Sequence, residues 1–225
     1  MLEGAFRFHC RHDWRGSLQN LEQAIAINPS LAHAHILLGL VLGTVRDPAA
    51  LAAIDTARQL DPLAPPVSLA RALCLSSWQR YEESESEVHR MLELNASFHP
   101  ALELAADLFW LRADPRALEW ERRVWAADAE MSALLARPDP GAALSDAATC
   151  LHRRAENRYV SPRVTARLLS LSGRIDESTS VLEDAIAEGD LMQIDFVQMA
   201  PSFETVRRTS RFAQLAAGIG LPDAD

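Results

Sequence analysis

The sequence contains no lysine, so all 22 of its basic residues are arginine, against 31 acidic residues and a formal net charge of −9. An acidic chain is a poor candidate for binding nucleic acid, because phosphate recognition requires clustered positive charge. We attribute the absence of lysine to a GC-rich coding sequence rather than to function. The proportions of apolar and charged residues are those of an ordinary packed, soluble protein.

Cysteine is also scarce, with Cys10, Cys74 and Cys150 far apart and none of them in a CxxC or Cys/His metal-ligand spacing. We expect reduced, mostly buried thiols in a cytoplasmic protein. The N-terminus carries charged residues where a signal peptide would have an apolar core. The longest apolar run, Ile36–Gly43, is too short to cross a bilayer and predicts a buried helix. No membrane partner is expected.

Two common signatures of catalysis are missing from the sequence. There is no Gly-x-Ser-x-Gly nucleophile elbow and no glycine-rich phosphate loop, since Gly39 and Gly43 fall inside an expected helix. At those two positions a small residue permits close helix packing. We therefore expect no cofactor and assign no catalytic residue.

One short phrase recurs along the first half of the chain. Asn28-Pro29, Asp61-Pro62 and Asn95 each follow an apolar run at helical spacing, at intervals of 33 (61−28) and 34 (95−61) residues. Such a period is typical of helical hairpins, which must stack to bury their apolar faces. We expect each Asn or Asp to end the second helix of a hairpin, because proline cannot continue a helix.

A second short motif, an Asp or Ser directly before a proline, occurs at other positions in the chain. Asp47-Pro48, Asp114-Pro115 and Ser161-Pro162 each place a side chain that can cap a helix directly before a proline. Proline is favoured at the first helical position, and the preceding side chain accepts a bond from a free helix N–H. These pairs predict three helix starts.

The spacing resembles that of the tetratricopeptide repeat (TPR) family, whose 34-residue unit carries small residues and a closing proline at set positions. The first unit offers Asp13-Trp14 at the turn, Ala24 as a small contact and Pro29 as the closing residue. The second offers Ala57 and Pro62. Further small positions of this pattern are Ser17, Ser84 and Ser178.

The pattern weakens along the chain. Met91 stands where the family prefers alanine, and the unit His99–Ala129 is irregular, with bulky tryptophans in its second helix. Arg137–Gly141 contains two prolines and a glycine, which predicts a loop or boundary. We expect helix to resume over Ala142–Asn157 and a last hairpin over Ser161–Glu188.

The C-terminal third resembles the ends of TPR arrays that follow bacterial adenylate cyclase, protein kinase and winged-helix regulator domains. The resemblance is carried by Arg158–Pro162, Ser172–Ser178, Met199–Phe212 and Gly218–Pro222 in that order. The chain departs at Thr209-Ser210, where the family has Asp-Pro. A free-standing adaptor and a C-terminal piece of a longer regulator both fit this likeness.

The resemblance implies an all-α, right-handed TPR superhelix, an α–α solenoid of about five helical hairpins with a C-terminal capping segment. We expect one domain over residues 1–225, with regular repeats over about 1–129 and an irregular linker over about 130–157. The last hairpin and cap would occupy about 158–222, with Phe203 and Phe212 covering the apolar face of that hairpin.

In a TPR stack the first helices of successive repeats line a concave face. This face is expected to begin apolar, to become acidic beside one tryptophan and to end basic. Such a groove suits an extended or helical peptide. The family positions place the following residues on or near it: Phe6, His9, Cys10, His33, Ile36, Leu40, Leu69, Leu73, Glu103, Asp107, Trp110, Arg163 and Arg167.

The leading hypothesis is a non-enzymatic interaction or adaptor module, with a regulatory role, that binds a protein or peptide in this groove. The alternative is an enzyme or small-molecule-binding protein that uses a pocket around Trp110, Glu103 and Asp107. Three further interpretations remain open: the apolar residues pack against one another and the terminal helix, the convex face is the working surface, or the chain forms a homo-oligomer.

Two clusters contain residue types that carry chemistry. The histidines of His9–His12 and His33–His35 are expected at opposite ends of parallel helices, about 15 Å apart, so we predict no metal site. Glu103 and Asp107 are four residues apart on one helix face beside Trp110. That spacing fits a proton-sharing catalytic pair, a solvated acidic face, or a docking site for a cationic ligand or arginine-bearing peptide; of the two functional interpretations we favour docking over catalysis.

Overall fold

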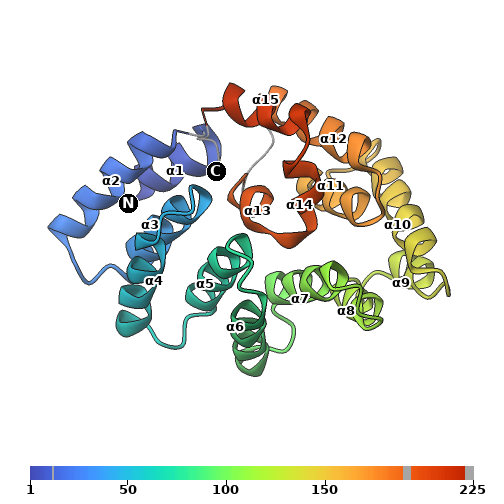
Figure 1. Cartoon of the computed structure of the whole chain (residues 1–225), viewed down its shortest axis with the longest axis horizontal. Coiled ribbons are helices and arrows are strands. Elements are labelled where there is room, and N and C mark those ends of the chain that lie inside the picture. The colour runs from blue at the N-terminus through green and yellow to red at the C-terminus, as the bar shows by residue number, and fades with distance from the viewer. Residues whose placement is uncertain (12, 190–193, 221–225) are drawn as a thin grey trace. The chain divides into compact units, whose positions relative to one another are not determined.

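The computed structural model describes residues 1–11, 13–189 and 194–220, apart from the side chains of residues 8–11, 194 and 195 (Figure 1). These residues form α-helices and one short 3-10 helix, with no strand among them, which confirms the prediction of an all-α protein. Within the same ranges, no helix combines the length and the apolar content needed to cross a bilayer.

The chain divides into two compact units. Unit 1 comprises Met1–Ala101 together with the described parts of Met192–Ala200 and Ala213–Asp225, and unit 2 comprises Leu102–Leu191 and Pro201–Phe212. The division therefore falls inside the helix His99–Leu111, and the C-terminal segment contributes to both units.

Unit 1 is built from consecutive helical hairpins. Neighbouring helices along the chain pack together, and the first helix of the second hairpin, α3, also contacts the first helix of the third, α5. This contact is the one that stacked hairpins make. The helices of unit 1 are α1 (Leu2–Arg11), α2 (Trp14–Ile27), α3 (Ala32–Thr44), α4 (Ala49–Leu60), α5 (Pro65–Ser77), α6 (Tyr81–Leu94) and α13 (Ile194–Met199), with most of α15 (Ser210–Gly218) (Figure 1).

The recurring Asn/Asp residues end these helices as predicted. Asn28, Asp61 and Asn95 directly follow α2, α4 and α6, and each donates its backbone N–H to the carbonyl four residues earlier at 2.9 Å. Their φ values of −140°, −143° and −150° are no longer helical. The three stop signals are confirmed.

The Asp-Pro pairs behave differently from the prediction. The carboxylates of Asp47 and Asp114 each accept the N–H two residues later at 2.8 Å, which forms a turn before the helix begins at Ala49 or Ala117. Ser161 does precede α11 (Pro162–Leu171), but its side chain makes no capping bond. Asp47 thus accepts the N–H of the first residue of α4, whereas Asp114 bonds to the residue just before α8 and Ser161 makes no such bond.

Three serines at the small positions link the two helices of a hairpin. Ser17 donates to Gly4 O at 2.8 Å, Ser84 to Ala72 O at 2.8 Å and Ser178 to Ala166 O at 2.7 Å. All three serines are fully buried. A larger side chain would separate the helix backbones and remove this bond, so the preference for a small residue here has two physical causes.

Glycine serves the same purpose in α3. A Cβ on Gly39 would lie 2.4 Å from Ile54 Cγ1, and one on Gly43 would lie 2.5 Å from Cys74 Sγ. Both distances are far below van der Waals contact. The two glycines therefore allow α3 to approach α4 and α5, as expected for small residues in mid-helix.

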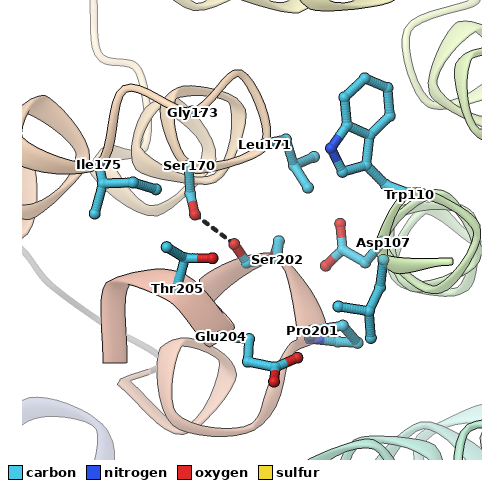
Figure 2. A pocket seen from close by; sticks show the side chains of 11 residues that line it. Asp107, Trp110, Ser170, Leu171, Gly173, Ile175, Pro201, Ser202, Glu204 and Thr205 are labelled. Carbon is cyan, nitrogen blue, oxygen red and sulfur yellow. Dashed lines mark hydrogen bonds between the residues drawn. The ribbon is translucent and has the colours of Figure 1, made fainter. Parts of the chain in front are cut away.

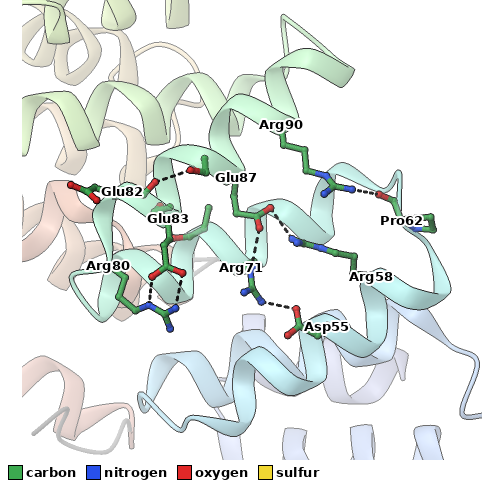
Figure 3. A network of polar contacts seen from close by, with 12 residues as sticks. Asp55, Arg58, Pro62, Arg71, Arg80, Glu82, Glu83, Glu87 and Arg90 are labelled. Atoms are coloured by element: carbon green, nitrogen blue, oxygen red, sulfur yellow. Dashed lines mark hydrogen bonds and ion pairs between the residues drawn. The ribbon is translucent and has the colours of Figure 1, made fainter.

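A network of charged side chains connects α4, α5 and α6 (Figure 3). The Glu87 carboxylate forms ion pairs with Arg58 Nη2 at 2.7 Å and with Arg71 Nε at 3.2 Å. Arg71 Nη1 also lies 2.6 Å from Asp55 Oδ1. Glu87 is 9% exposed. Two guanidinium groups thus neutralise one buried carboxylate where three helices meet.

Unit 2 has shorter and less regular helices. Its core joins Met131 and Leu135 to Leu144 and Leu168, with Trp110 packed at the edge. Its elements are α8 (Ala117–Val124), α9 (Ala129–Leu135), α10 (Pro140–Ala155), α11 (Pro162–Leu171), α12 (Ile175–Ala187), the 3-10 helix Pro201–Phe203 and α14 (Glu204–Arg207), with most of α7 (His99–Leu111) and the start of α15 (Ser210–Gly218).

Residues 130–157, expected to form an irregular linker, are mostly helical. Helix α9 spans Ala129–Leu135 and α10 spans Pro140–Ala155, and the predicted loop at Arg137–Gly141 overlaps the short gap between them. Asp139 caps α10 by accepting N–H groups from Gly141 and Ala142 at 3.0 and 3.2 Å.

The closing segment packs on the last hairpin. The 3-10 helix Pro201–Phe203 contacts α11, and α14 contacts α12. Phe203 is 0% exposed and Phe212 is 4% exposed. Both phenylalanines are buried, as expected of a segment that covers an apolar helix face.

Candidate functional site

The predicted groove residues fall in two places, one in each unit. Ile36, Leu40, Leu69 and Leu73 meet in unit 1, whereas Glu103, Asp107, Trp110, Arg163 and Arg167 belong to unit 2. Phe6 is 46% exposed and takes no part in the site of unit 1. The side chains of His9 and Cys10 lie outside the described part of the structure.

The apolar residues line a hollow of about 240 Å³, which we call the apolar hollow. Ile36 and Leu40 are four residues apart on α3, and Leu69 and Leu73 are four apart on α5, so each pair lies on one helix face. Ile36 and Leu73 are buried, while Leu40 and Leu69 are half-buried. The exposed His33 stands among the lining residues.

The sequence did not reveal what lies against this hollow. Phe196 of α13 contributes to its lining, and α13 packs against both α3 and α5. Val197 and Met199 of the same helix are 0% exposed. Phe, Val and Met at positions i, i+1 and i+3 before a proline were the available signal, but six residues are too few to show helical periodicity.

The charged residues of unit 2 form a buried cluster around Arg167. Its Nε donates to Asp107 Oδ1 at 2.7 Å, and its Nη1 and Nη2 donate to the two carboxylate oxygens of Glu121 at 2.9 and 2.8 Å. Nη2 also reaches the backbone oxygen of Glu103 at 3.2 Å. The Arg167 side chain is 1% exposed. This one residue of α11 is thus bonded to both α7 and α8.

A second ion pair lies one helical turn away. Arg163 Nη2 is 3.0 Å from Glu103 Oε2, and Arg163 precedes Arg167 by four residues just as Glu103 precedes Asp107. The two carboxylates predicted as an acidic docking site are therefore paired with the two arginines predicted as a separate basic region. Glu103 and Asp107 are 4% and 2% exposed, so they do not form a solvated acidic face.

Glu121 belongs to this cluster and was not predicted. Besides Arg167, it accepts a bond from Trp125 Nε1 at 2.9 Å. The sequence had suggested only that tryptophans crowd this helix. In the structure, one of these tryptophans, Trp125, donates its indole N–H to the buried carboxylate of Glu121.

The surroundings shift the pKa of two members of the cluster, Asp107 and Arg167. Burial raises the pKa of the Asp107 carboxyl above its ordinary value, and the nearby Arg167 charge and Ser202 hydroxyl only partly oppose this effect. For Arg167, burial would lower the pKa, but Asp107 and Glu121 outweigh burial and hold it well above its ordinary value.

Beside Asp107 there is a second hollow of about 270 Å³, the polar hollow (Figure 2). Figure 2 shows Asp107 and the Trp110 indole on one side of it, facing Ser170 and Ser202, where Ser170 Oγ donates to Ser202 O. Glu204 and Thr205 complete its polar lining. Glu103 does not line this space. Glu103 and Asp107 therefore do not form a joint site in the polar hollow.

The histidines offer little support for a metal centre. His35 Nε2 lies 2.9 Å from the backbone oxygen of Pro29, which accounts for one of its ring nitrogens. Within the described ranges, no three His, Cys, Asp or Glu side chains gather in a way that could hold a metal ion. His9–His12, the other half of the pattern, lies outside the side chains described.

The protein was also compared with known families. No protein-family model matches the chain, and a search of curated proteins gives no significant match. The interpretation of both hollows therefore depends on the geometry and chemistry of this chain's own residues.

Proposed function

We propose that the chain is a TPR-like solenoid that acts as a non-enzymatic interaction module and binds an apolar peptide segment of a partner protein. The observation that carries this proposal is the apolar hollow, which is lined by half-buried Leu40 and Leu69 together with buried Ile36 and Leu73. The hairpin contacts and the buried serine bonds support the TPR-like assignment.

The chemistry of the hollow favours a peptide. Aliphatic side chains on two neighbouring helices provide a surface for the apolar face of a helical segment, the usual mode of helix-in-groove recognition. The net charge of −9 makes nucleic acid an unfavourable partner. A regulatory adaptor in the cytoplasm is the role that fits these properties.

Selection from a displayed library of random peptides, carried out on the full chain, tests this proposal. We expect enriched peptides with an apolar helical face, and we expect Leu69→Glu to weaken their binding at least tenfold, because it places a charge at the half-buried edge of the hollow. Leu63→Glu is the matched control, since Leu63 is 68% exposed and belongs to the same unit. Equal binding by both variants would exclude the hollow as the working surface.

The polar hollow supports a second candidate function, the binding of a small molecule. Trp110 offers a flat apolar face, and Asp107, with its raised pKa, offers a carboxyl that can either accept or donate a hydrogen bond. A small polar ligand with one flat apolar side would fit this combination. The pairing of Glu103 with Arg163 makes a Glu103–Asp107 catalytic pair the weaker form of this candidate.

A thermal-shift screen of small polar compounds tests this second candidate. A true ligand should raise the melting temperature of the wild-type chain and lose most of that effect on Trp110→Ala. Trp78→Ala, in unit 1, controls for the loss of an indole elsewhere. A ligand whose effect persists in Trp110→Ala binds at another place.

A further inference from the structure

The apolar hollow already has a helix of the same chain beside it. Helix α13 (Ile194–Met199) contacts α3 and α5, the two helices that carry the aliphatic lining. Phe196 forms part of the wall of the hollow, and Val197 and Met199 are completely buried. The chain thus supplies its own short apolar helix at the surface expected to receive a partner.

We call the surface of α3 and α5 on which α13 packs its seat. This seat accommodates the flexible, sulfur-bearing side chain of Met199. A Cβ on Gly43 would lie 3.0 Å from Met199 Sδ and 2.5 Å from Cys74 Sγ. Both sulfur atoms therefore lie beside the glycine. The absence of a side chain at position 43 makes room for Met199 between α3 and α5, and methionine is the residue that best fills irregular spaces.

Helix α13 depends on this seat for its order. Six residues are too few for a helix that is stable in water without packing partners. The described residues before and after it in the chain, up to Gly189 and from Pro201 to Phe212, are assigned to unit 2, whereas α13 is assigned to unit 1. A segment that needs packing partners for its order can be exchanged for another segment that offers the same packing.

We propose that α13 is an internal occupant of the binding groove, and that the partner is a short helix with an aromatic, a β-branched residue and a methionine in the order of Phe196, Val197 and Met199. This inference rests on the proposed function and specifies its ligand. The partner displaces α13, and binding is autoinhibited until it does so.

Tethering explains why such competition would regulate binding. An attached segment acts at an effective concentration in the millimolar range, so a free peptide of equal intrinsic affinity binds less tightly than its contacts allow. The apparent affinity equals the intrinsic affinity multiplied by the fraction of chains in which the groove is open. Any event that unseats α13 therefore increases affinity for the partner.

The thiol of Cys74 reports whether α13 is seated. Cys74 is 0% exposed and shares its surroundings with Met199, whereas Cys150 is 4% exposed in the core of unit 2. Val197→Asp places a charge in the buried face of α13. In the full-length Val197→Asp chain we expect Cys74 to react with a maleimide at least tenfold faster than in wild type, as mapped by mass spectrometry, with the rate at Cys150 unchanged.

A peptide added in trans supplies the second measurement. A synthetic peptide with the sequence of residues 194–202 should restore the protection of Cys74 in Val197→Asp and bind this variant at least tenfold more tightly than it binds wild type. The same peptide carrying Phe196→Ser and Met199→Ser is the control and should do neither. In wild type, excess peptide should increase hydrogen–deuterium exchange in the chain's own residues 194–200.

Three results would overturn the inference. An unchanged rate at Cys74 would mean that α13 does not leave its seat, and equal acceleration at Cys74 and Cys150 would mean that α13 is an integral part of the fold. Failure of the α13 peptide to protect Cys74 would exclude the stated ligand. The proposed function fails separately, if selected peptides ignore Leu69→Glu while α13 still behaves as described.

Discussion

Arg167 Nε lies 2.7 Å from Asp107 Oδ1, with the two side chains 1% and 3% exposed. The two residues are 60 positions apart in the chain. The pair, shared with Glu121, joins α7, α8 and α11, so it contributes to the architecture of unit 2 as well as to the wall of the polar hollow.

Replacing Arg167 by methionine should strongly destabilise the protein. The variant leaves Asp107 and Glu121 buried without their guanidinium, and losing one partner of a buried ion pair typically costs about 3–5 kcal/mol. We expect the free energy of unfolding from urea titration to fall by about this amount at neutral pH. The loss should shrink under mildly acidic conditions, because protonation removes the unpaired charges.

Arg163→Met provides the comparison within the same helix. Arg163 is 13% exposed and bonds to Glu103 through one nitrogen at 3.0 Å. Its removal should cost less than half as much as that of Arg167. Similar losses in the two variants would contradict the central position assigned to Arg167.

Local signals in the sequence predicted local structure well. Asn28, Asp61 and Asn95 marked three helix ends correctly, because the Asx–turn signal depends only on neighbouring residues. The buried serines at positions 17, 84 and 178 were also recognisable, since a small residue at a close helix contact repeats with the hairpin. These features predict the helical hairpins from the sequence alone.

Long-range pairing was beyond the reach of the sequence. Glu103, Asp107, Arg163 and Arg167 are all predicted as site residues, but the sequence pattern places them in successive acidic and basic parts of one open groove instead of one buried cluster. The sequence alone does not distinguish a solvated arginine from one that is neutralised by a carboxylate 60 residues away. Helix α13 was missed for a related reason, because its order comes from packing on α3 and α5 rather than from its own propensity.

Asp128 should make stability depend on pH in the acid range. It caps α9 through Met131 N at 3.1 Å and pairs with Arg154 at 2.5 and 2.9 Å, and bonding to Arg154 is the main cause that lowers its pKa to about 2. A depressed pKa in the folded state adds stability above the ordinary value of 3.8, and this stability is lost as the pH falls towards 2.

The measurement compares wild type with Asp128→Asn in urea titrations from pH 7 to pH 2. Since the side chain is 29% exposed, we expect a difference of only about 1 kcal/mol at pH 7, after allowance for solvent screening. The difference should disappear between pH 4 and pH 2. A difference that stays constant over this range would show that the charge of Asp128 does not contribute.

The network of Figure 3 predicts a contrast between two glutamates of α6. Glu87→Gln removes the charge that Arg58 and Arg71 share in a buried setting, and hydrogen bonds to charged groups contribute about 1.5–3 kcal/mol each. We expect a loss of about 2 kcal/mol in the free energy of unfolding, since the amide retains part of the bonding.

Glu83→Gln is the matched substitution on the same helix. Glu83 pairs with Arg80 three residues earlier in an exposed position, and such pairs contribute about 0–1 kcal/mol. Its effect should be clearly smaller than that of Glu87→Gln and should fade further in high salt. A larger loss for Glu83→Gln than for Glu87→Gln would reverse the assignment of the network's centre.

Two glycines predict opposite responses to alanine. A Cβ on Gly39 would lie 2.4 Å from Ile54 Cγ1 and 3.1 Å from the backbone oxygen of Ala50, so Gly39→Ala must separate α3 from α4. Alanine gains about 1 kcal/mol of helix propensity over glycine, but overpacking a core contact costs about 1–3 kcal/mol. We expect net destabilisation, because the backbone atom of Ala50 cannot move aside by changing its rotamer.

Gly141 is the control, since its Cβ would meet only Asp139 Oδ1 at 3.5 Å, an ordinary contact. There the propensity gain is unopposed, so Gly141→Ala should leave stability unchanged or raise it slightly. Thermal unfolding followed by circular dichroism distinguishes the two variants. A stabilising Gly39→Ala would mean that α3 and α4 are not in close contact at this position, and the close packing inferred for the second hairpin would be wrong.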